Sequence, residues 1–274
     1  MHITLVPYGG LCNRLNSIAA GVAYMKNNPQ ADMRILWFKY WHCHCRFRDL
    51  FKPLPPGCVP VEELTWQLKD VPGHKSNLYI PHLFRGIWYD FSFLPGMSAD
   101  SFDELTEGKE RVYIYHENRF CKVSDAILDM SYADLFRPVD DLQERIDAVT
   151  GDWAGSYVVG LHIRRTDNAG AISGSPDEFF YNAVEVEMAE HPDVRFYVAS
   201  DDESVKRGLK DRYGDRIITF PLCLKRNSVQ GMKDAVVDLF CLGSTRKIYG
   251  SMSSSYSNFA GKLYGIEVIK SLQA

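Results

Sequence analysis

Short apolar runs and helical periodicities alternate along most of the chain. Residues 3–6 form an apolar run that Tyr8-Gly9-Gly10 interrupts. Apolar residues then recur at helical spacing from Leu11 to Val22, and Asn27-Asn28-Pro29 predicts the end of that helix. Further short strands are predicted at residues 35–38 and 112–115.

The second half shows the same alternation more regularly. Strands are predicted at residues 157–163, 195–199, 216–220, 247–249 and 266–270. Ser175-Pro176-Asp177-Glu178 has the form of a capping box with proline at the first helical position, and residues 200–203 repeat the start signal. An apolar helix at 233–242 ends at Gly243, and a last helix follows residues 253–255. This order predicts an α/β fold with parallel sheets and helices on both faces.

Prolines and aromatic residues crowd residues 41–103, which predicts long loops and short elements. The aromatic side chains there form either a core beneath the loops or a surface that stacks on an acceptor sugar. We place a boundary within residues 138–155, between an N-terminal, acceptor-side domain (1–145) and a C-terminal, nucleotide-sugar-binding domain (146–274).

Composition restricts the partners. The 274 residues carry a net charge of −4, so no broad positive field attracts nucleic acid. The N-terminus has no basic segment followed by a long apolar run, and no stretch approaches the ~18 apolar residues of a membrane span. Seven scattered cysteines indicate reduced thiols, and we expect a cytoplasmic protein.

Charged residues cluster where the strand at 157–163 ends. His162, Arg164, Arg165 and Asp167 follow one another within six residues. Open α/β sheets bind ligands beyond the carboxyl ends of their strands. Paired guanidinium groups match the oxygens of a diphosphate, whereas the alternative is a surface turn in which Asp167 pairs with the arginines.

The segment His162-Ile163-Arg164-Arg165-Thr166-Asp167 resembles the H-x-R-R-x-D signature of α1,6-fucosyltransferases, which include nodulation enzymes. Its H-x-R part recurs in α1,2- and protein O-fucosyltransferases. Three segments agree in order with other motifs of this superfamily: the glycine loop at residues 9–15, the strand end at 198–202, and residues 237–239 with 252–257.

The resemblance implies two Rossmann-like domains that face each other across a cleft, as in the GT-B fold. It implies that Arg164 and Arg165 hold the β-phosphate of GDP-fucose and act in catalysis, and that Asp167 orients them. Other donor contacts are implied for Gly10, Asn13, Arg14, His162, Asp201, Asp202, Asp238, Ser253, Ser254 and Ser255.

Several of these residues have an alternative, structural interpretation. Asp201 and Asp202 could favour the positive end of a helix dipole, and the serines could cap a helix. The glycine pair could serve only a tight turn from strand to helix. Asn13 and Arg14, in the first turn of that helix, could reach either donor or acceptor.

No metal is expected at the donor site, because the D-x-D site of metal-dependent transferases is absent. Strand alternation in Trp41-His42-Cys43-His44-Cys45 places the histidines and cysteines on opposite faces, without paired C-x-x-C spacing. The resemblance implies a metal-independent, inverting glycosyltransferase that moves fucose from GDP-fucose to a glycan. The alternatives are a non-catalytic nucleotide-sugar or glycan-binding protein, and a phosphatase-like hydrolase with Asp201 as nucleophile.

Overall fold

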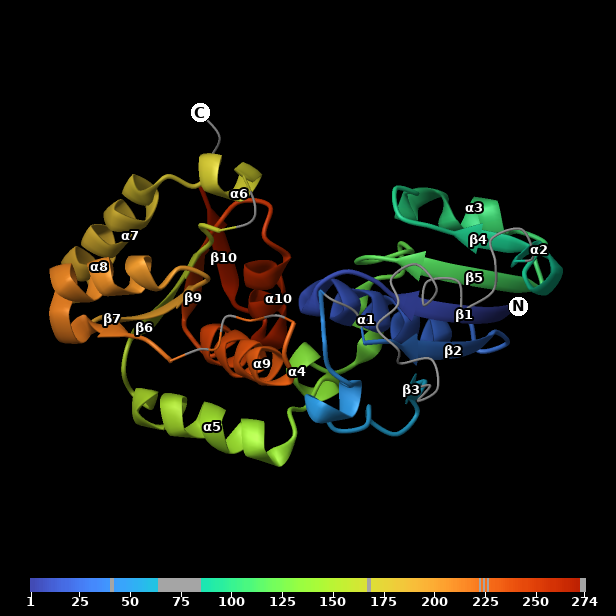
Figure 1. Ribbon diagram of the computed structural model, residues 1–274, viewed down its shortest axis with the longest axis horizontal. Coiled ribbons are helices and arrows are strands. Elements are labelled where there is room, and N and C mark those ends of the chain that lie inside the picture. The colour runs from blue at the N-terminus through green and yellow to red at the C-terminus, as the bar shows by residue number, and fades with distance from the viewer. Residues whose placement is uncertain are drawn as a thin grey trace. The chain divides into compact units, whose positions relative to one another are not determined.

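The computed structural model describes residues 1–39, 42–63, 85–166, 169–221, 223, 225 and 227–271. The chain forms two compact units, Met1–Val139 with Lys225–Met232, and Asp140–Leu224 with Lys233–Ala274. Each unit contains one five-stranded parallel sheet with helices, which confirms the predicted α/β class with parallel sheets (Figure 1). The division falls between Val139 and Asp140. The ranges 1–145 and 146–274, the roles of the domains and a cleft between them stay predictions.

The sheet of the first unit has the strand order β3-β2-β1-β5-β4, and every adjacent pair is parallel. Leu5 of β1 lies opposite Ile35 of β2 and Ile114 of β5, and all three are fully buried. The strands are β1 (His2–Pro7), β2 (Asp32–Trp37), β3 (Val61–Glu63), β4 (Phe91–Phe93) and β5 (Arg111–His116), and the α-helices are α1 (Leu11–Asn27), α2 (Arg85–Trp88), α3 (Phe102–Thr106) and α4 (Tyr132–Leu135).

The sheet of the second unit has the order β10-β9-β6-β7-β8 and is also parallel. Its strands are β6 (Val158–Ile163), β7 (Arg195–Ser200), β8 (Ile217–Ile218), β9 (Lys247–Gly250) and β10 (Glu267–Lys270). Its helices are α5 (Asp140–Thr150), α6 (Ala169–Ser173), α7 (Asp177–Glu190), α8 (Glu203–Tyr213), α9 (Val229–Gly243) and α10 (Ser255–Tyr264). The chain runs outward from β6 to one edge and then returns to β9, so the order reverses between β6 and β9. In doubly wound sheets, ligands bind at this reversal.

Strand β6 is buried on both faces, which explains its unbroken apolar run. On one face Val159, Leu161 and Ile163 pack against α7 and α8 residues such as Phe180 and Leu209. On the other face Gly160 meets α9, because a Cβ built there would lie 2.8 Å from a methyl group of Leu242. His162 is two residues further on, so it faces the same side as Gly160.

Two predicted helix starts are wrong in detail. Pro176, not Ser175, is the N-cap of α7, and the Ser175 hydroxyl instead accepts a hydrogen bond from the Met252 amide at 2.7 Å. Asp202, not Ser200, caps α8 by accepting from the Ser204 amide at 2.8 Å. At Ser175 a tertiary contact overrides the local capping signal, whereas the Ser200 hydroxyl accepts a local hydrogen bond from the Asp202 amide at 3.2 Å.

The aromatic-rich segment is described only in part, since Trp41 and residues 64–84 lie outside the described residues. Phe47 and Phe93 belong to the core, whereas Trp88 is about half exposed. Residues 42–45 do not form a regular strand, although Cys43 and Cys45 share one buried side with their sulfur atoms 3.9 Å apart. All seven cysteines are free thiols. None of the described helices has the length and apolarity needed to cross a membrane.

Candidate donor-binding site

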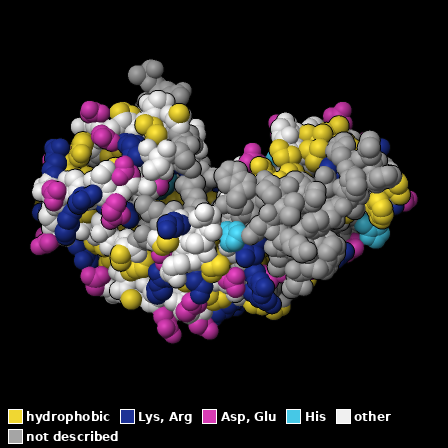
Figure 2. Space-filling view, in the orientation of Figure 1, with side chains coloured by type: hydrophobic (Ala, Val, Ile, Leu, Met, Phe, Trp, Pro, Cys, Tyr) yellow, Lys and Arg dark blue, Asp and Glu magenta, His cyan; other side chains and the backbone are white. Residues whose placement is uncertain are grey.

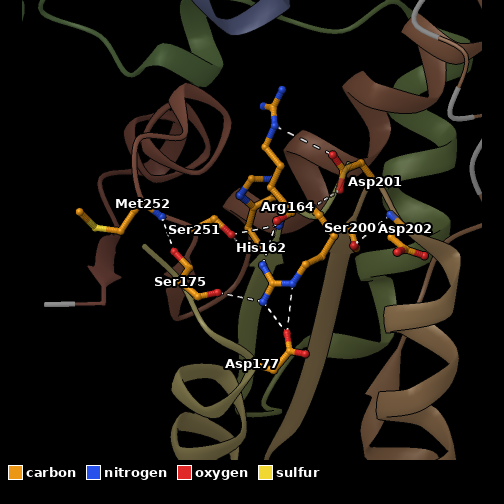
Figure 3. Close-up of polar contacts among 10 residues, drawn as sticks. His162, Arg164, Ser175, Asp177, Ser200, Asp201, Asp202, Ser251 and Met252 are labelled. Atoms are coloured by element: carbon orange, nitrogen blue, oxygen red, sulfur yellow. Dashed lines mark hydrogen bonds and ion pairs between the residues drawn. The ribbon is translucent and has the colours of Figure 1, made fainter. Parts of the chain in front are cut away.

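The carboxyl ends of β6 and β9 meet at the reversal point of the second sheet. His162 of β6 lies opposite Gly250 of β9. Beyond this pair, the Ser251 hydroxyl accepts a hydrogen bond from the Arg164 amide at 3.0 Å and donates to the His162 carbonyl at 3.1 Å (Figure 3). The two predicted motifs, far apart in the sequence, are therefore joined by one serine side chain.

Arg165 is bound to its own unit on nearly every side. Its guanidinium donates to the Asp177 carboxylate at 3.1 and 2.5 Å, to the Ser175 carbonyl at 2.9 Å and to the Arg164 carbonyl at 2.9 Å. The side chain is 12 % exposed, and the guanidinium lies over the ring of Phe180. These contacts hold Arg165 against its own unit, and its contact with a phosphate group stays a prediction.

Arg164 has a different environment. Its backbone amide is fixed by Ser251, while its side chain extends away from the other labelled residues (Figure 3). The nearest carboxylate oxygen of Asp201 is 3.9 Å from Nε, which makes a loose ion pair. In Figure 3 the terminal nitrogens of the Arg164 guanidinium point away from Asp201. A contact of Arg164 with a phosphate group stays a prediction.

Asp201 organises the loop that presents the arginines. Its carboxylate accepts from the Arg165 amide at 2.7 Å and from the Thr166 hydroxyl at 2.7 Å. The sequence assigns this orienting task to Asp167, which lies outside the described residues. Asp202 lies at the positive end of a helix dipole, as the alternative interpretation predicted. Its carboxylate caps α8, and the hydrogen bonds from Ser204 are the main cause of its lowered pKa.

The three serines occupy distinct positions at the start of α10. Ser253 has a left-handed backbone with φ of 51°, Ser254 is the N-cap and Ser255 is the first helical residue. Ser254 is 1 % exposed, yet its hydroxyl makes no capping bond and has no hydrogen-bond partner. A buried hydroxyl of this kind is costly. The N-terminus of α10 thus combines free backbone N–H groups with an unsatisfied hydroxyl, which is the composition of an anion site.

A buried polar chain lies behind this edge. His162 stacks on the ring of Tyr256 with 5.1 Å between centroids, and the Tyr256 hydroxyl donates to Asp238 at 3.1 Å. The Tyr197 hydroxyl donates to the same carboxylate at 2.7 Å. Burial raises the pKa of Asp238 to about 6 in spite of these two hydrogen bonds. The structure therefore brings the predicted base-binding residues His162 and Asp238 together through Tyr256.

Sequence reasoning missed Tyr256, Tyr197 and Ser251 as members of this site. Tyr256 lies inside the quoted serine motif, so its position was a usable signal. Ser251 precedes that motif directly. Tyr197 lies within an apolar strand run, where nothing in the sequence indicates that its hydroxyl meets Asp238.

The predicted contacts of the first unit lie at the end of β1. Gly10 is the N-cap of α1, and Gly9 has φ of 84° where a side chain would crowd Asn13. Arg14 is 2 % exposed, with its guanidinium bound to the carbonyls of Gly9 and Phe38 at 2.8 and 2.6 Å. Arg14 therefore holds the glycine turn together, which differs from the predicted donor contact.

Asn13 differs from its neighbour Arg14. Its side-chain oxygen is buried and has no hydrogen-bond partner. Its carbonyl accepts a hydrogen bond from the amide of Asn118, which follows β5. A contact of Gly10 or Asn13 with the donor stays a prediction.

One cluster at the opposite edge of the second sheet has the residue types of a metal site. Glu187, Glu190 and His191 offer ligand atoms within 4.8 Å of one another at the end of α7. Glu187 is already neutralised, because the Lys247 ammonium and the Tyr249 hydroxyl each lie 2.6 Å from its Oε1. This pairing supplies a counter-charge for Oε1, while Oε2 of Glu187 is buried without a hydrogen-bond partner among the described residues.

The surface carries no broad field of one sign on the face shown in Figure 2. Positive and negative side chains mix over the second unit, in accord with the net charge of −4. This face therefore offers no long-range electrostatic attraction to an anion.

No family model matches the sequence, and no curated protein matches it. Solved structures do match. The fucosyltransferase NodZ from Bradyrhizobium superposes with a TM-score of 0.65 at 15% identity, covering 96% of this chain and 93% of that one. NodZ α-1,6-fucosyltransferase soaked with GDP-fucose gives 0.61 at 15% identity, with 96% and 92% covered. POFUT1 in complex with GDP gives 0.54 at 10% identity, with 98% of each chain covered. The chain has the fold of these fucosyltransferases.

Proposed function

We propose that this protein is a glycosyltransferase that transfers fucose from GDP-fucose to a glycan acceptor, without a metal and with inversion at the sugar carbon. The observation that carries the proposal is that the residue before the α10 loop, Ser251, fixes the Arg164 amide, while Ser254 at the α10 N-terminus has a buried hydroxyl without a hydrogen-bond partner among the described residues. The shared fold supports it, since neighbours of that fold were crystallised with GDP or GDP-fucose.

Breaking the bond between sugar and diphosphate leaves negative charge on the β-phosphate. Preorganised donors aimed at such developing charge lower the barrier, and each is worth about 10²–10³ in rate. Arg164 would donate its guanidinium N–H groups, and the first turn of α10 its backbone N–H groups. These are the tasks that a metal ion performs in metal-dependent transferases.

The buried polar chain would serve the nucleotide base. A guanine presents adjacent N–H donors along one edge, and a carboxylate accepts two such bonds. Asp238 would accept them, while the stacked pair of His162 and Tyr256 would fix the ring on one side. This assignment accounts for a carboxylate that is buried at a cost, with its pKa raised to about 6 by burial.

A binding and turnover series tests the proposal. GDP should raise the melting temperature more than UDP or CMP at equal concentration. GDP-fucose should be slowly hydrolysed, at a rate unchanged by EDTA, and transfer to a glycan should yield the anomer opposite to that of the donor. Equal stabilisation by all three nucleotides would contradict the GDP assignment. Tight GDP-fucose binding without turnover would instead identify a non-catalytic binding protein.

A further inference from the structure

Lys270 is the last residue of β10 and lies at the same sheet edge as the donor site. It pairs in register with Gly250 of β9. Its ammonium donates to the Ser251 carbonyl at 2.8 Å and to the Ser257 hydroxyl at 2.6 Å. Both acceptors are neutral oxygens, so this cation has no carboxylate partner among the described residues.

The segments packed around the ammonium do not supply a counter-charge. The loop at residues 251–254 contains no ionisable side chain. The ionisable residues of β9, α10 and β10 are Lys247, Tyr249, Tyr256, Lys262, Tyr264 and Glu267. Of these, Lys247 pairs with Glu187 at the far end of β9, and none makes a hydrogen bond or ion pair with Lys270. Burial alone lowers the pKa of Lys270 to about 8. Keeping a half-buried ammonium on neutral acceptors costs stability, which suggests that an anion completes the site.

Lys270 contacts Ser251 and Ser257, two residues that adjoin the donor site. The Ser251 carbonyl that it holds belongs to the residue whose hydroxyl fixes the Arg164 amide. The Ser257 hydroxyl that it holds lies in the first turn of α10, three residues after the unsatisfied Ser254. The ammonium is therefore bound to two residues that adjoin the groups assigned to the diphosphate.

We propose that Lys270 is a second cation of the diphosphate site, a positioning and electrostatic residue that becomes fully protonated when the donor binds. This inference rests on the proposed function. It couples donor binding to the uptake of a proton in weakly alkaline solution. A site built from arginines alone would lack this coupling.

The direction of the pH dependence follows from the free protein. Below about pH 8 Lys270 is already charged, so its contribution to the affinity for the diphosphate is constant there. Above about pH 8 the free protein loses the proton and binding must restore it, so affinity falls as pH rises. An arginine at this position stays charged and removes that slope.

Calorimetric titration with GDP at pH 8, repeated in buffers of different ionisation enthalpy, measures this proton. The wild-type protein should take up about half a proton per GDP, since a group at its pKa is half protonated. Lys270→Met should take up none and bind about tenfold or more weakly. Lys270→Arg should retain most of the affinity and take up none. Lys210→Met, which removes a half-exposed lysine of α8, is the matched control and should behave as wild type.

The outcomes separate the two proposals. Unchanged affinity and proton uptake in folded Lys270→Met would overturn the role of Lys270 and leave the proposed function standing. Failure of the wild type to prefer GDP would overturn the proposed function. In that case a parallel titration with pyrophosphate would still test whether Lys270 contributes to binding a diphosphate. Lys270→Met removes a desolvated charge but also leaves the Ser251 carbonyl and the Ser257 hydroxyl without their donor, so its unliganded melting temperature is measured first to show that the variant is folded. If it does not fold, proton uptake that persists in Lys270→Arg would overturn the inference.

Discussion

Arg165 donates to Asp177 through two nitrogens at 3.1 and 2.5 Å, whereas Nε of its neighbour Arg164 lies 3.9 Å from the Asp201 carboxylate. The two arginines of one motif thus have unequal tasks. Arg165 ties the end of β6 to the start of α7, and this contact fixes the backbone from which Arg164 extends.

Replacing Arg165 should therefore act mainly on stability. Arg165→Met leaves the Ser175 and Arg164 carbonyls without their donor, and we expect a loss of about 1–3 kcal/mol in the free energy of unfolding. Urea unfolding followed by near-UV circular dichroism measures this. Unaltered stability together with abolished GDP binding would show instead that Arg165 contacts the ligand directly.

Ser254 and Ser131 form a matched pair of helix-cap serines. Ser131 accepts a hydrogen bond from the Asp134 amide at 3.0 Å, so Ser131→Ala should cost about 1 kcal/mol and leave GDP affinity unchanged. Ser254→Ala breaks no hydrogen bond, so it should leave the unliganded melting temperature unchanged and weaken GDP binding. Calorimetry and titration on both variants provide the comparison. A lower melting temperature with normal affinity for Ser254→Ala would mean that the serine is only structural.

Gly250 lets α10 approach β9 closely. A Cβ at this position would lie 2.7 Å from the Ser257 hydroxyl oxygen and 3.0 Å from Nζ of Lys270. Gly250→Ala should displace both groups, destabilise the unit by about 1–3 kcal/mol and weaken GDP binding. Gly208→Ala, in α8 with open space around it, is the control and should be neutral or stabilising. Normal GDP binding by Gly250→Ala would argue against a role for this contact in the site.

Asp238 makes stability depend on pH. Its folded pKa of about 6 lies above the ordinary 3.8, so between these values the folded state binds more protons than the unfolded state. Stability from this group is therefore present at low pH and falls as pH rises towards about 6, by up to about 3 kcal/mol. Relative to wild type, Asp238→Asn should become more stable as pH rises over this range. Above it, the difference in the free energy of unfolding should stay constant. Thermal unfolding from pH 4 to 8 measures the difference, and a flat profile would contradict the raised pKa.

The sequence predicted the elements of the second unit well because its strands are continuous apolar runs separated by helical periodicity. It predicted less well where tertiary contacts replace local ones. Ser175 matches a helix-start pattern, but Pro176 is the N-cap because the Ser175 hydroxyl is bound to the distant Met252 amide. At the next helix the start pattern is off by two residues, since Asp202 rather than Ser200 is the N-cap.

The candidate site shows the same contrast. The motif at residues 162–165 correctly brought polar groups to the strand tip, because position along a strand fixes which sheet edge a residue reaches. Which arginine is held and which extends depends on Asp177 and Asp201, residues 12 and 36 positions after Arg165, and such distant partners leave no local pattern. Lys270 could not be predicted as a site residue for the same reason, because in the sequence it is only the last residue of a short strand.

The affinity of Arg164→Met for GDP tests the central claim most directly. Arg246→Met, an exposed arginine at the opposite end of β9, is the control for the lost charge. Titration calorimetry should show GDP binding weakened by about two orders of magnitude for Arg164→Met, normal for Arg246→Met, and an unliganded melting temperature equal to wild type. Wild-type affinity in the folded Arg164→Met protein would contradict the assignment of this sheet edge to the diphosphate.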